Sequence, residues 1–225
     1  MTNQNINQQL RYLKEAALCL QLAGFHTEPI LGSVLPVTLE GQSLGCVTSK
    51  GSTLIHKDNI GNGEAEDAAH RMADIAARTL EYMTMLECAP QLQTNGLEGD
   101  YRILADFGDA VLAGHPTERG VQFVTWEWDF DREGVHHGHY FQQDYEAAKR
   151  DFTVRSGLVQ KDALFEPEQL AEIYRALAFV REQDETLSFG RDQDLAEFME
   201  QVSGLLPPNV PRQQDAPEQI GMTMQ

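Results

Sequence analysis

Residues 121–141 read VQFVTWEWDF, DREG, VHHGHYF. The outer parts of this stretch, residues 121–130 and 135–141, are rich in β-branched and aromatic side chains. Such runs favour strands, and a short polar segment that ends in glycine is typical of a hairpin loop between them. The stretch therefore predicts two antiparallel strands joined by residues 131–134.

The register of this hairpin determines which side chains share a face. If residues 131–134 form the whole loop, Phe130 faces Val135 and Asp129 faces His136. One face then carries an apolar and aromatic set: Val124, Trp126, Trp128, Phe130, His137, His139 and Phe141. The other face pairs Asp129 with His136, and Glu127 and Tyr140 lie nearby. Because a slip of one residue would exchange the faces of a strand, this assignment depends on the loop.

Similar signals flank the hairpin on both sides. Residues 101–106 and 110–113 surround the turn sequence Phe107-Gly108-Asp109, which adds two strands and gives a four-stranded antiparallel meander. Three helices follow. The first covers residues 145–156 with Asp144 as its N-cap, the second begins at Glu166-Pro167, and the third carries Leu195, Phe198, Met199 and Val202.

The N-terminal part has the same mixed character. Apolar residues at steps of three and four predict a helix that ends before Gly24: Ile6, Leu10, Leu13, Ala17 and Leu20. Short strands are predicted over residues 35–39, 44–46 and 54–55, and a long helix from residue 64 to Leu86, before Pro90. The predicted fold class is α+β, with short antiparallel β-meanders packed against helices and a C-terminal helical segment.

The domain boundary is predicted in residues 91–99, which contain few large apolar groups and no periodic pattern. The chain then divides into a helix/β-hairpin/helix unit over residues 1–92 and a second unit over residues 100–206, which holds the meander and three helices. Residues 207–225 contain Pro207, Pro208, Pro211 and Pro217 and few apolar groups, so a disordered tail is predicted there.

Composition excludes several classes of function. The 225 residues include 17 basic and 35 acidic side chains, a net charge of −18, and such a field repels phosphate backbones and anionic membranes. There is no run of about 20 apolar residues and no basic, apolar leader, so we expect a cytoplasmic protein that binds neither nucleic acid directly nor membranes. The cysteines, Cys19, Cys46 and Cys88, are far apart and odd in number, which favours buried thiols over disulfides or a zinc knuckle.

The hairpin holds the candidate site residues. An exposed part of it is predicted to bind a partner protein through Trp126, Trp128, Asp129, His136 and Tyr140. His137 and His139 are candidate ligands for zinc or iron, because alternate residues of a strand point to the same side. Two histidines do not make a site, so packing of both imidazoles in the aromatic core is the favoured interpretation, and no cofactor is predicted. Likewise, Asp129 and His136 fit a surface ion pair better than a general-base dyad.

Templates of known catalytic sites are missing. The chain has no G-x-x-x-x-G-K-[ST] and no G-x-S-x-G motif, and Gly61-Asn62-Gly63 lacks the third glycine of a dinucleotide fingerprint. No catalytic residue is therefore assigned, and the sequence leans away from an enzyme.

Part of the chain resembles a known group of proteins. The motif residues are FVTWEWD at 123–129, GHY at 138–140, AKRDF at 148–152 and RSGL at 155–158. They are similar to uncharacterised accessory proteins encoded on conjugative elements of gut bacteria, over residues 101–200. That group has no established activity, so the resemblance implies an accessory role and assigns no functional residue.

Three functions follow as hypotheses. The first is a non-catalytic, acidic accessory protein of a mobile element that binds a partner protein. The second is a DNA mimic whose carboxylates occupy the basic groove of a host DNA-binding enzyme. The third is a metal-dependent enzyme centred on the histidine-rich hairpin, with a further ligand from elsewhere in the chain.

Overall fold

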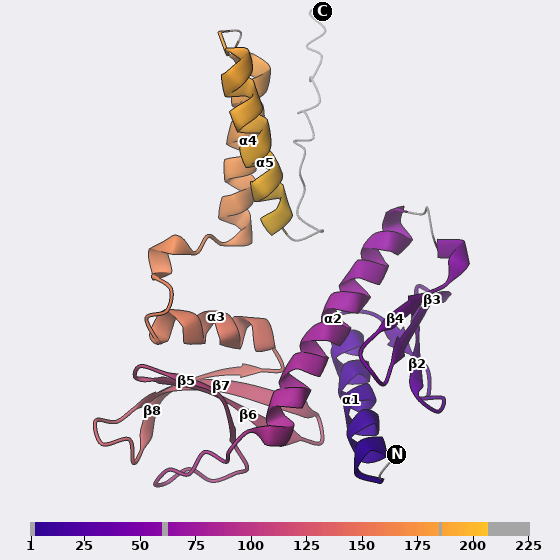
Figure 1. Ribbon diagram of the computed structural model, residues 1–225, viewed down its shortest axis with the longest axis vertical. Helices are drawn as coiled ribbons and strands as arrows, with labels where there is room; N and C mark the ends of the chain where they lie inside the picture. Colours follow the sequence, from indigo (N-terminus) through magenta and orange to yellow (C-terminus); the bar gives the residue numbers. More distant parts are fainter. Residues whose placement is uncertain (1–2, 60–62, 185, 207–225) are drawn as a thin grey trace, which may run out of the picture. The chain divides into compact units, whose positions relative to one another are not determined.

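The computed structural model describes residues 3–59, 63–184 and 186–206 (Figure 1). Contacts divide the chain into two compact units, residues 1–160 and residues 161–225, and each is described by itself. The first unit contains two antiparallel four-stranded sheets, and the second contains a pair of helices. The predicted α+β class is confirmed. The predicted disordered tail, residues 207–225, lies outside the described residues.

The first sheet packs against two helices. Its strand order is β1-β2-β3-β4, with every neighbouring pair antiparallel. The elements are α1 (Asn3–Leu22), β1 (His26–Thr27), β2 (Val34–Leu39), β3 (Gln42–Thr48), β4 (Thr53–Ile55) and α2 (Gly63–Cys88), with a 3-10 turn at Lys57–Asn59. The core between them contains Leu13 and Leu20 from α1, Val37 and Val47 from the sheet, and Met72 from α2.

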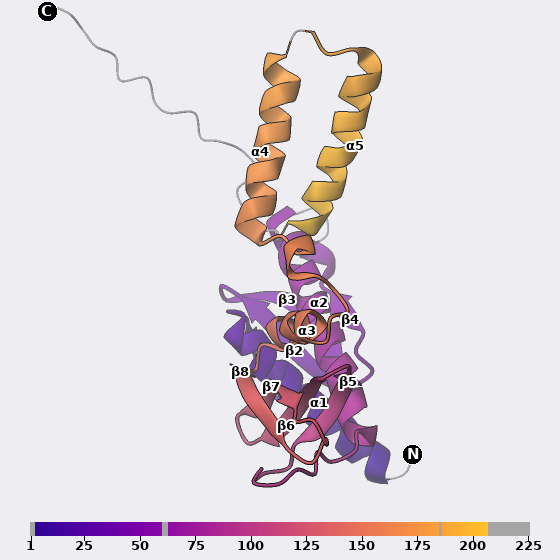
Figure 2. The same cartoon turned by 90° about the vertical axis from the view of Figure 1, so that its left-hand side faces the viewer.

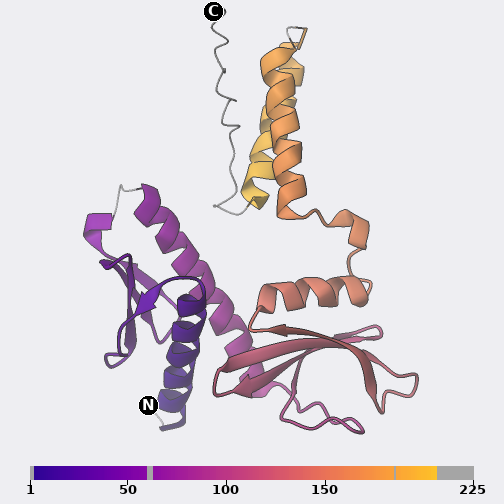
Figure 3. The same cartoon turned by 180° about the vertical axis from the view of Figure 1, so that it is seen from behind.

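The second sheet is the predicted meander. It consists of β5 (Arg102–Phe107), β6 (Ala110–Thr117), β7 (Gly120–Trp128) and β8 (Val135–Gln142), in that order and antiparallel throughout. One face packs on α3 (Tyr145–Arg155) and on the C-terminal half of α2, and the segment leading into β5 covers the other face (Figure 3). Alternation along the strands explains both layers, since Leu112 faces the helices whereas Val111 and Ala113 face the covering segment.

Helix α2 belongs to both cores of the first unit. Its N-terminal half contributes Ala69 and Met72 to the core of the first sheet, and its C-terminal half contributes Tyr82, Met83 and Leu86 to the core of the second. The chain therefore does not divide at residues 91–99 as the sequence predicts. The division falls at residue 160 instead, because a continuous helix of 26 residues holds both sheets.

Local signals set the ends of the last three helices. Asp144 caps α3 by accepting a hydrogen bond from the backbone N–H of Ala147 at 3.0 Å, as predicted. The second unit is an antiparallel hairpin of α4 (Pro167–Gln183), which begins with a Glu166–Gln169 capping box, and α5 (Phe189–Leu205), which is capped by Ser188 (Figure 2). Among the described residues, no helix is long and apolar enough to cross a membrane.

Candidate functional site: the histidine-rich edge of the second sheet

The β7–β8 loop is longer than the sequence predicts. The backbone N–H of Asp129 donates to Gly134 O at 3.0 Å, so the turn spans residues 129–134 and Trp128 pairs with Val135. His136 consequently faces Glu127, and the predicted pairing of Asp129 with His136 is wrong. The physical reason is that the extra loop residues close through their own hydrogen bonds.

A β-bulge in β8, opposite Trp126, then changes which side chains of β8 share a face with those of β7. Trp126 faces both His137 and Gly138, because Thr125 pairs with His139 while Glu127 pairs with His136. The backbone of His137 is left-handed, with φ 50°, a conformation typical of a bulge residue and more usual for glycine. At Gly138 a Cβ atom would lie 2.4 Å from Nε1 of Trp126, so only glycine lets the indole pack there.

The bulge separates the histidines from the tryptophans. Trp126 is 4% exposed and packs edge-on against Tyr101 and Tyr140, on the face covered by the segment before β5. His137 and His139 instead contact Glu127 and Asp151, respectively, on the face toward α3. The prediction that both histidines share the apolar face of Trp126 and Trp128 is therefore wrong.

Arg155 is the centre of a polar network between α3 and this strand pair. Its side chain is only 8% exposed. The guanidinium donates to Thr125 O at 3.1 Å and to His137 O at 2.7 Å, and it pairs with Oε1 of Glu127 at 3.0 Å. A rigid fork of donors thereby ties the last turn of α3 to both strands and holds the bulge.

Asp151, one turn earlier on α3, completes the network. It accepts a hydrogen bond from the hydroxyl of Thr125, which is fully buried. Its other oxygen lies 3.1 Å from Nδ1 of His139. The contacts of His139 are thus with a helix carboxylate, and they do not include Glu127 or His137.

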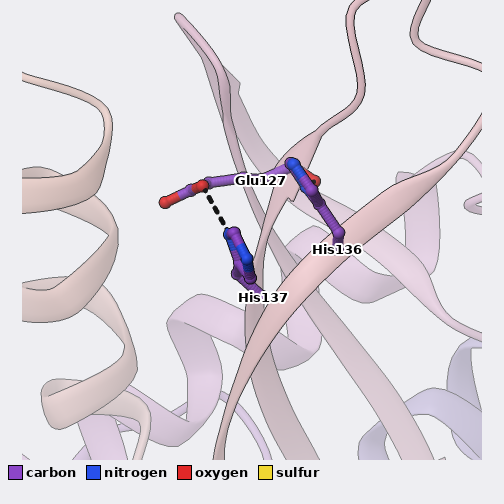
Figure 4. A group of neighbouring side chains, drawn as sticks. All are labelled: Glu127, His136 and His137. Atoms are coloured by element: carbon purple, nitrogen blue, oxygen red, sulfur yellow. Dashed lines mark hydrogen bonds and ion pairs between the residues drawn. The ribbon is translucent and has the colours of Figure 1, made fainter.

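Glu127, His136 and His137 form a separate cluster at the exposed end of the network (Figure 4). Nδ1 of His137 lies 3.1 Å from Oε2 of Glu127, and Nδ1 of His136 lies 2.8 Å from Glu127 O. The two rings stack with centroids 4.5 Å apart. The hydrogen bond with His137 and that with Arg155 hold the pKa of the Glu127 carboxyl below its usual range.

The five predicted partner-binding residues do not form one surface. Trp126 is buried, and Trp128 is half-buried beneath the Arg132 guanidinium, with its indole N–H directed to Asp106 at 3.2 Å. Asp129 lies in the turn, where the backbone N–H of Gly134 lowers its pKa. His136 and Tyr140 are exposed on opposite faces, because they pair with Glu127 and Val124 respectively.

The sequence interpretation missed the residues that organise this edge: Thr125, Asp151 and Arg155. No local pattern marks them, since they lie up to 30 residues apart and meet only through the docking of α3. A basic residue in the last turn of a helix is ordinarily explained by the helix dipole. Only its burial in the structure distinguishes Arg155 from an ordinary basic residue at the end of a helix.

A cavity of about 440 Å³ lies elsewhere in the first unit, between α1, α2 and the start of α3. Its lining includes Cys19, Arg78 and Tyr82. Burial raises the pKa of the Cys19 thiol, and the Tyr82 hydroxyl donates to Glu15 at 3.0 Å. The thiol thus remains protonated at neutral pH, which does not suit a nucleophile.

The second unit exposes much of its apolar surface. In residues 161–184 and 186–206 the buried hydrophobic residues are Ala171, Leu195, Val202 and Leu206. Six large hydrophobic side chains there are exposed: Phe165, Phe179, Val180, Phe189, Phe198 and Leu205. Two helices that bury so little are marginal by themselves, so this exposure makes the hairpin a candidate for binding a protein.

Comparison with protein-family models, with curated proteins and with solved structures finds no match to this chain, so its own geometry carries the functional argument.

Proposed function

We propose that the chain is a non-catalytic protein-interaction protein that docks on its partner through one face of the α4–α5 hairpin. The observation that carries this proposal is the exposure of large apolar side chains on a two-helix unit with a small core. An accessory role of this kind is also what the resemblance to proteins of conjugative elements implies.

Helix α4 carries an apolar stripe apart from its buried Ala171. Ile173, Ala176, Leu177 and Val180 follow the i, i+3, i+4, i+7 spacing that aligns side chains on one face. Ile173 and Leu177 are half-buried, and Val180 is 40% exposed. Counted at about 100° per residue, this stripe lies on the side of α4 opposite the buried Ala171.

Helix α5 extends the same surface. Phe198 and Leu205 are seven residues apart, two helical turns, and are 47% and 68% exposed. Counting at 100° per residue from the buried Leu195, both lie to one side of the interhelical contact, and we infer that they extend the apolar surface that the stripe of α4 begins. We call this surface, made by Ile173, Leu177, Val180, Phe198 and Leu205, the hairpin face.

Charge indicates the kind of partner. Residues 161–206 contain 4 basic and 11 acidic side chains, a net charge of −7. Two such hairpins repel each other, whereas a partner with an apolar groove rimmed by lysine and arginine is complementary. The proposed occupant of the hairpin face is therefore a different protein with a basic, apolar surface.

The test is site-specific photo-crosslinking of the full chain in cells, followed by binding measurements on the purified pair. A benzoylphenylalanine at position 198 should capture a basic protein, and Phe198→Glu should weaken binding of that purified protein about tenfold or more. The matched control is Phe130→Glu, since Phe130 is fully exposed in the β7–β8 loop. It should leave the affinity unchanged.

Two outcomes would contradict the proposal. If Phe130→Glu weakens binding and Phe198→Glu does not, the aromatic hairpin of the second sheet is the docking surface. If position 198 crosslinks only to a second copy of the chain, the hairpin is a dimerisation element. Capture of a DNA-binding enzyme through its DNA groove would favour the DNA-mimic alternative.

A further inference from the structure

Two neighbouring histidines in β8 point to the same side, which a regular strand does not allow. Side chains of consecutive strand residues point to opposite faces. His136 and His137 instead stack with an interplanar angle of 13°, because the bulge and the left-handed backbone of His137 turn the second ring toward the first. Both rings then lie beside the carboxylate of Glu127, which comes from the facing strand.

The backbone of His137 makes this arrangement costly to maintain. A residue other than glycine in the left-handed region costs about 1 kcal/mol or more, and such positions concentrate at functional sites. A glycine at position 137 would form the same bulge without that cost. The imidazole therefore stands at a position where the backbone conformation by itself favours glycine.

The three side chains supply a set of ligands suited to a transition metal. We infer that Glu127, His136 and His137 bind one divalent transition-metal ion of the zinc class. Two imidazoles and a carboxylate suit such ions, and the three ligand atoms lie within 4.8 Å of one another. This site differs from the one expected from the sequence, because His139 is held by Asp151 and takes no part in it.

Hydrogen bonds already orient two of the ligands. A backbone carbonyl can only accept, so Nδ1 of His136 donates to Glu127 O and the lone pair of the neutral ring lies on Nε2. This pattern of a histidine anchored through one nitrogen is usual for metal ligands. Arg155 holds Oε1 of Glu127, which leaves Oε2 as the oxygen directed to His137.

Binding requires a small closing movement. Two atoms that are each about 2.1 Å from a zinc ion lie at most about 4.2 Å apart. The Nδ1–Oε2 pair of His137 and Glu127 already meets this limit at 3.1 Å. The stacked rings lie in nearly parallel planes, so their lone pairs cannot meet at one ion until one ring rotates. The side chain of His137 is 71% exposed, so burial does not hinder this rotation. Water completes the coordination of a site with three protein ligands.

The experiment uses the full chain, stripped with a chelator and titrated with zinc sulfate by calorimetry. The wild type should bind one zinc ion, and the ¹⁵N resonances of the His136 and His137 rings should shift while that of His139 does not. His137→Gly should weaken zinc binding at least about tenfold. Its free energy of unfolding without metal should stay unchanged or rise, because glycine relieves the left-handed backbone.

His139→Ala is the matched control, since it removes another exposed histidine of the same strand. It should leave zinc affinity unchanged. Glu127→Gln, which keeps the shape of the side chain, should lower the affinity as His137→Gly does. No binding by the wild type, equal loss in His139→Ala, or undiminished binding in a His136→Ala/His137→Gly double variant would each overturn the inference.

Discussion

Arg155 carries more of the local structure than any other charged residue at the edge of the second sheet. It satisfies backbone carbonyls on two strands and faces the carboxylates of Glu127 and Asp151. Removing it takes this donor from the carbonyls of Thr125 and His137 and one of several partners from each carboxylate. We predict that Arg155→Met lowers the free energy of unfolding by about 2–3 kcal/mol, measured by urea denaturation.

The variant Arg155→Lys distinguishes the contribution of the positive charge from that of the guanidinium hydrogen bonds. A lysine keeps the charge but cannot donate to several oxygens in a fixed fork, so it should recover less than half of the loss. Full recovery by lysine would show that charge alone matters here and that the network of hydrogen bonds contributes little.

The buried hydroxyl of Tyr12 makes the free energy of unfolding depend on pH in the alkaline range. This hydroxyl donates to Ala76 O at 3.1 Å, and burial raises its pKa from 10.0 to about 12. The folded state thus holds the proton more tightly than the unfolded state. The associated stability is complete below pH 10 and is lost as pH rises toward 12, by about 2–3 kcal/mol. Urea denaturation between pH 8 and pH 12 should show this fall.

Tyr12→Phe is the variant that assigns the effect. It should cost about 1 kcal/mol at neutral pH, through the lost hydrogen bond, and should flatten the alkaline decline. Burial also raises the pKa of Tyr82 and Tyr145, so part of the decline should remain. An unchanged slope in Tyr12→Phe would contradict the assignment.

Among the helices and strands, the sequence predicts the features that depend on neighbouring residues and fails where the interacting residues are far apart in the chain. Asp144 and Pro167 mark helix starts through hydrogen bonds and backbone angles within a few residues, and both predictions are confirmed. The sequence does not predict the register of β7 and β8, because the pairing has two bulges, at His137 and near Gln142, which no local pattern marks. The composition of the metal site depends on this register, so the sequence predicts His137 as a ligand but does not bring Glu127 and His136 together with it.

The bulge in β8 depends on Gly138. A Cβ atom there would meet the indole of Trp126, which is 4% exposed and packs edge-on against Tyr101 and Tyr140. Gly138→Ala should therefore displace Trp126 or β8 and cost about 1–3 kcal/mol, with a change in tryptophan fluorescence. As a control, Gly190→Ala in α5 has open space around its Cβ position and should leave both quantities close to the wild type.

The division between the two compact units at residue 160 has a direct test. The three apolar clusters all lie within residues 12–152. A chain ending at residue 160 should therefore fold and unfold cooperatively with nearly the stability of the full chain, as measured by circular dichroism. A chain ending at residue 95 should not fold, because Tyr82, Met83 and Leu86 lose their partners on the second sheet. A folded 1–95 chain would restore the boundary that the sequence predicts.

The buried carboxylate of Glu15 in α1 has hydrogen-bond donors that are synthesised much later than Glu15 itself. Its Oε1 accepts from the hydroxyl of Tyr82 and, at 2.8 Å, from the backbone N–H of Val121, a residue 106 positions later. At a synthesis rate of about 5–20 residues per second, roughly 5–20 s pass between the synthesis of Glu15 and that of Val121. During that interval Glu15 lacks one of its two donors, so the contact of α1 with the second sheet cannot form. The beginning of the nascent chain therefore reaches its final packing only after β7 has left the ribosome.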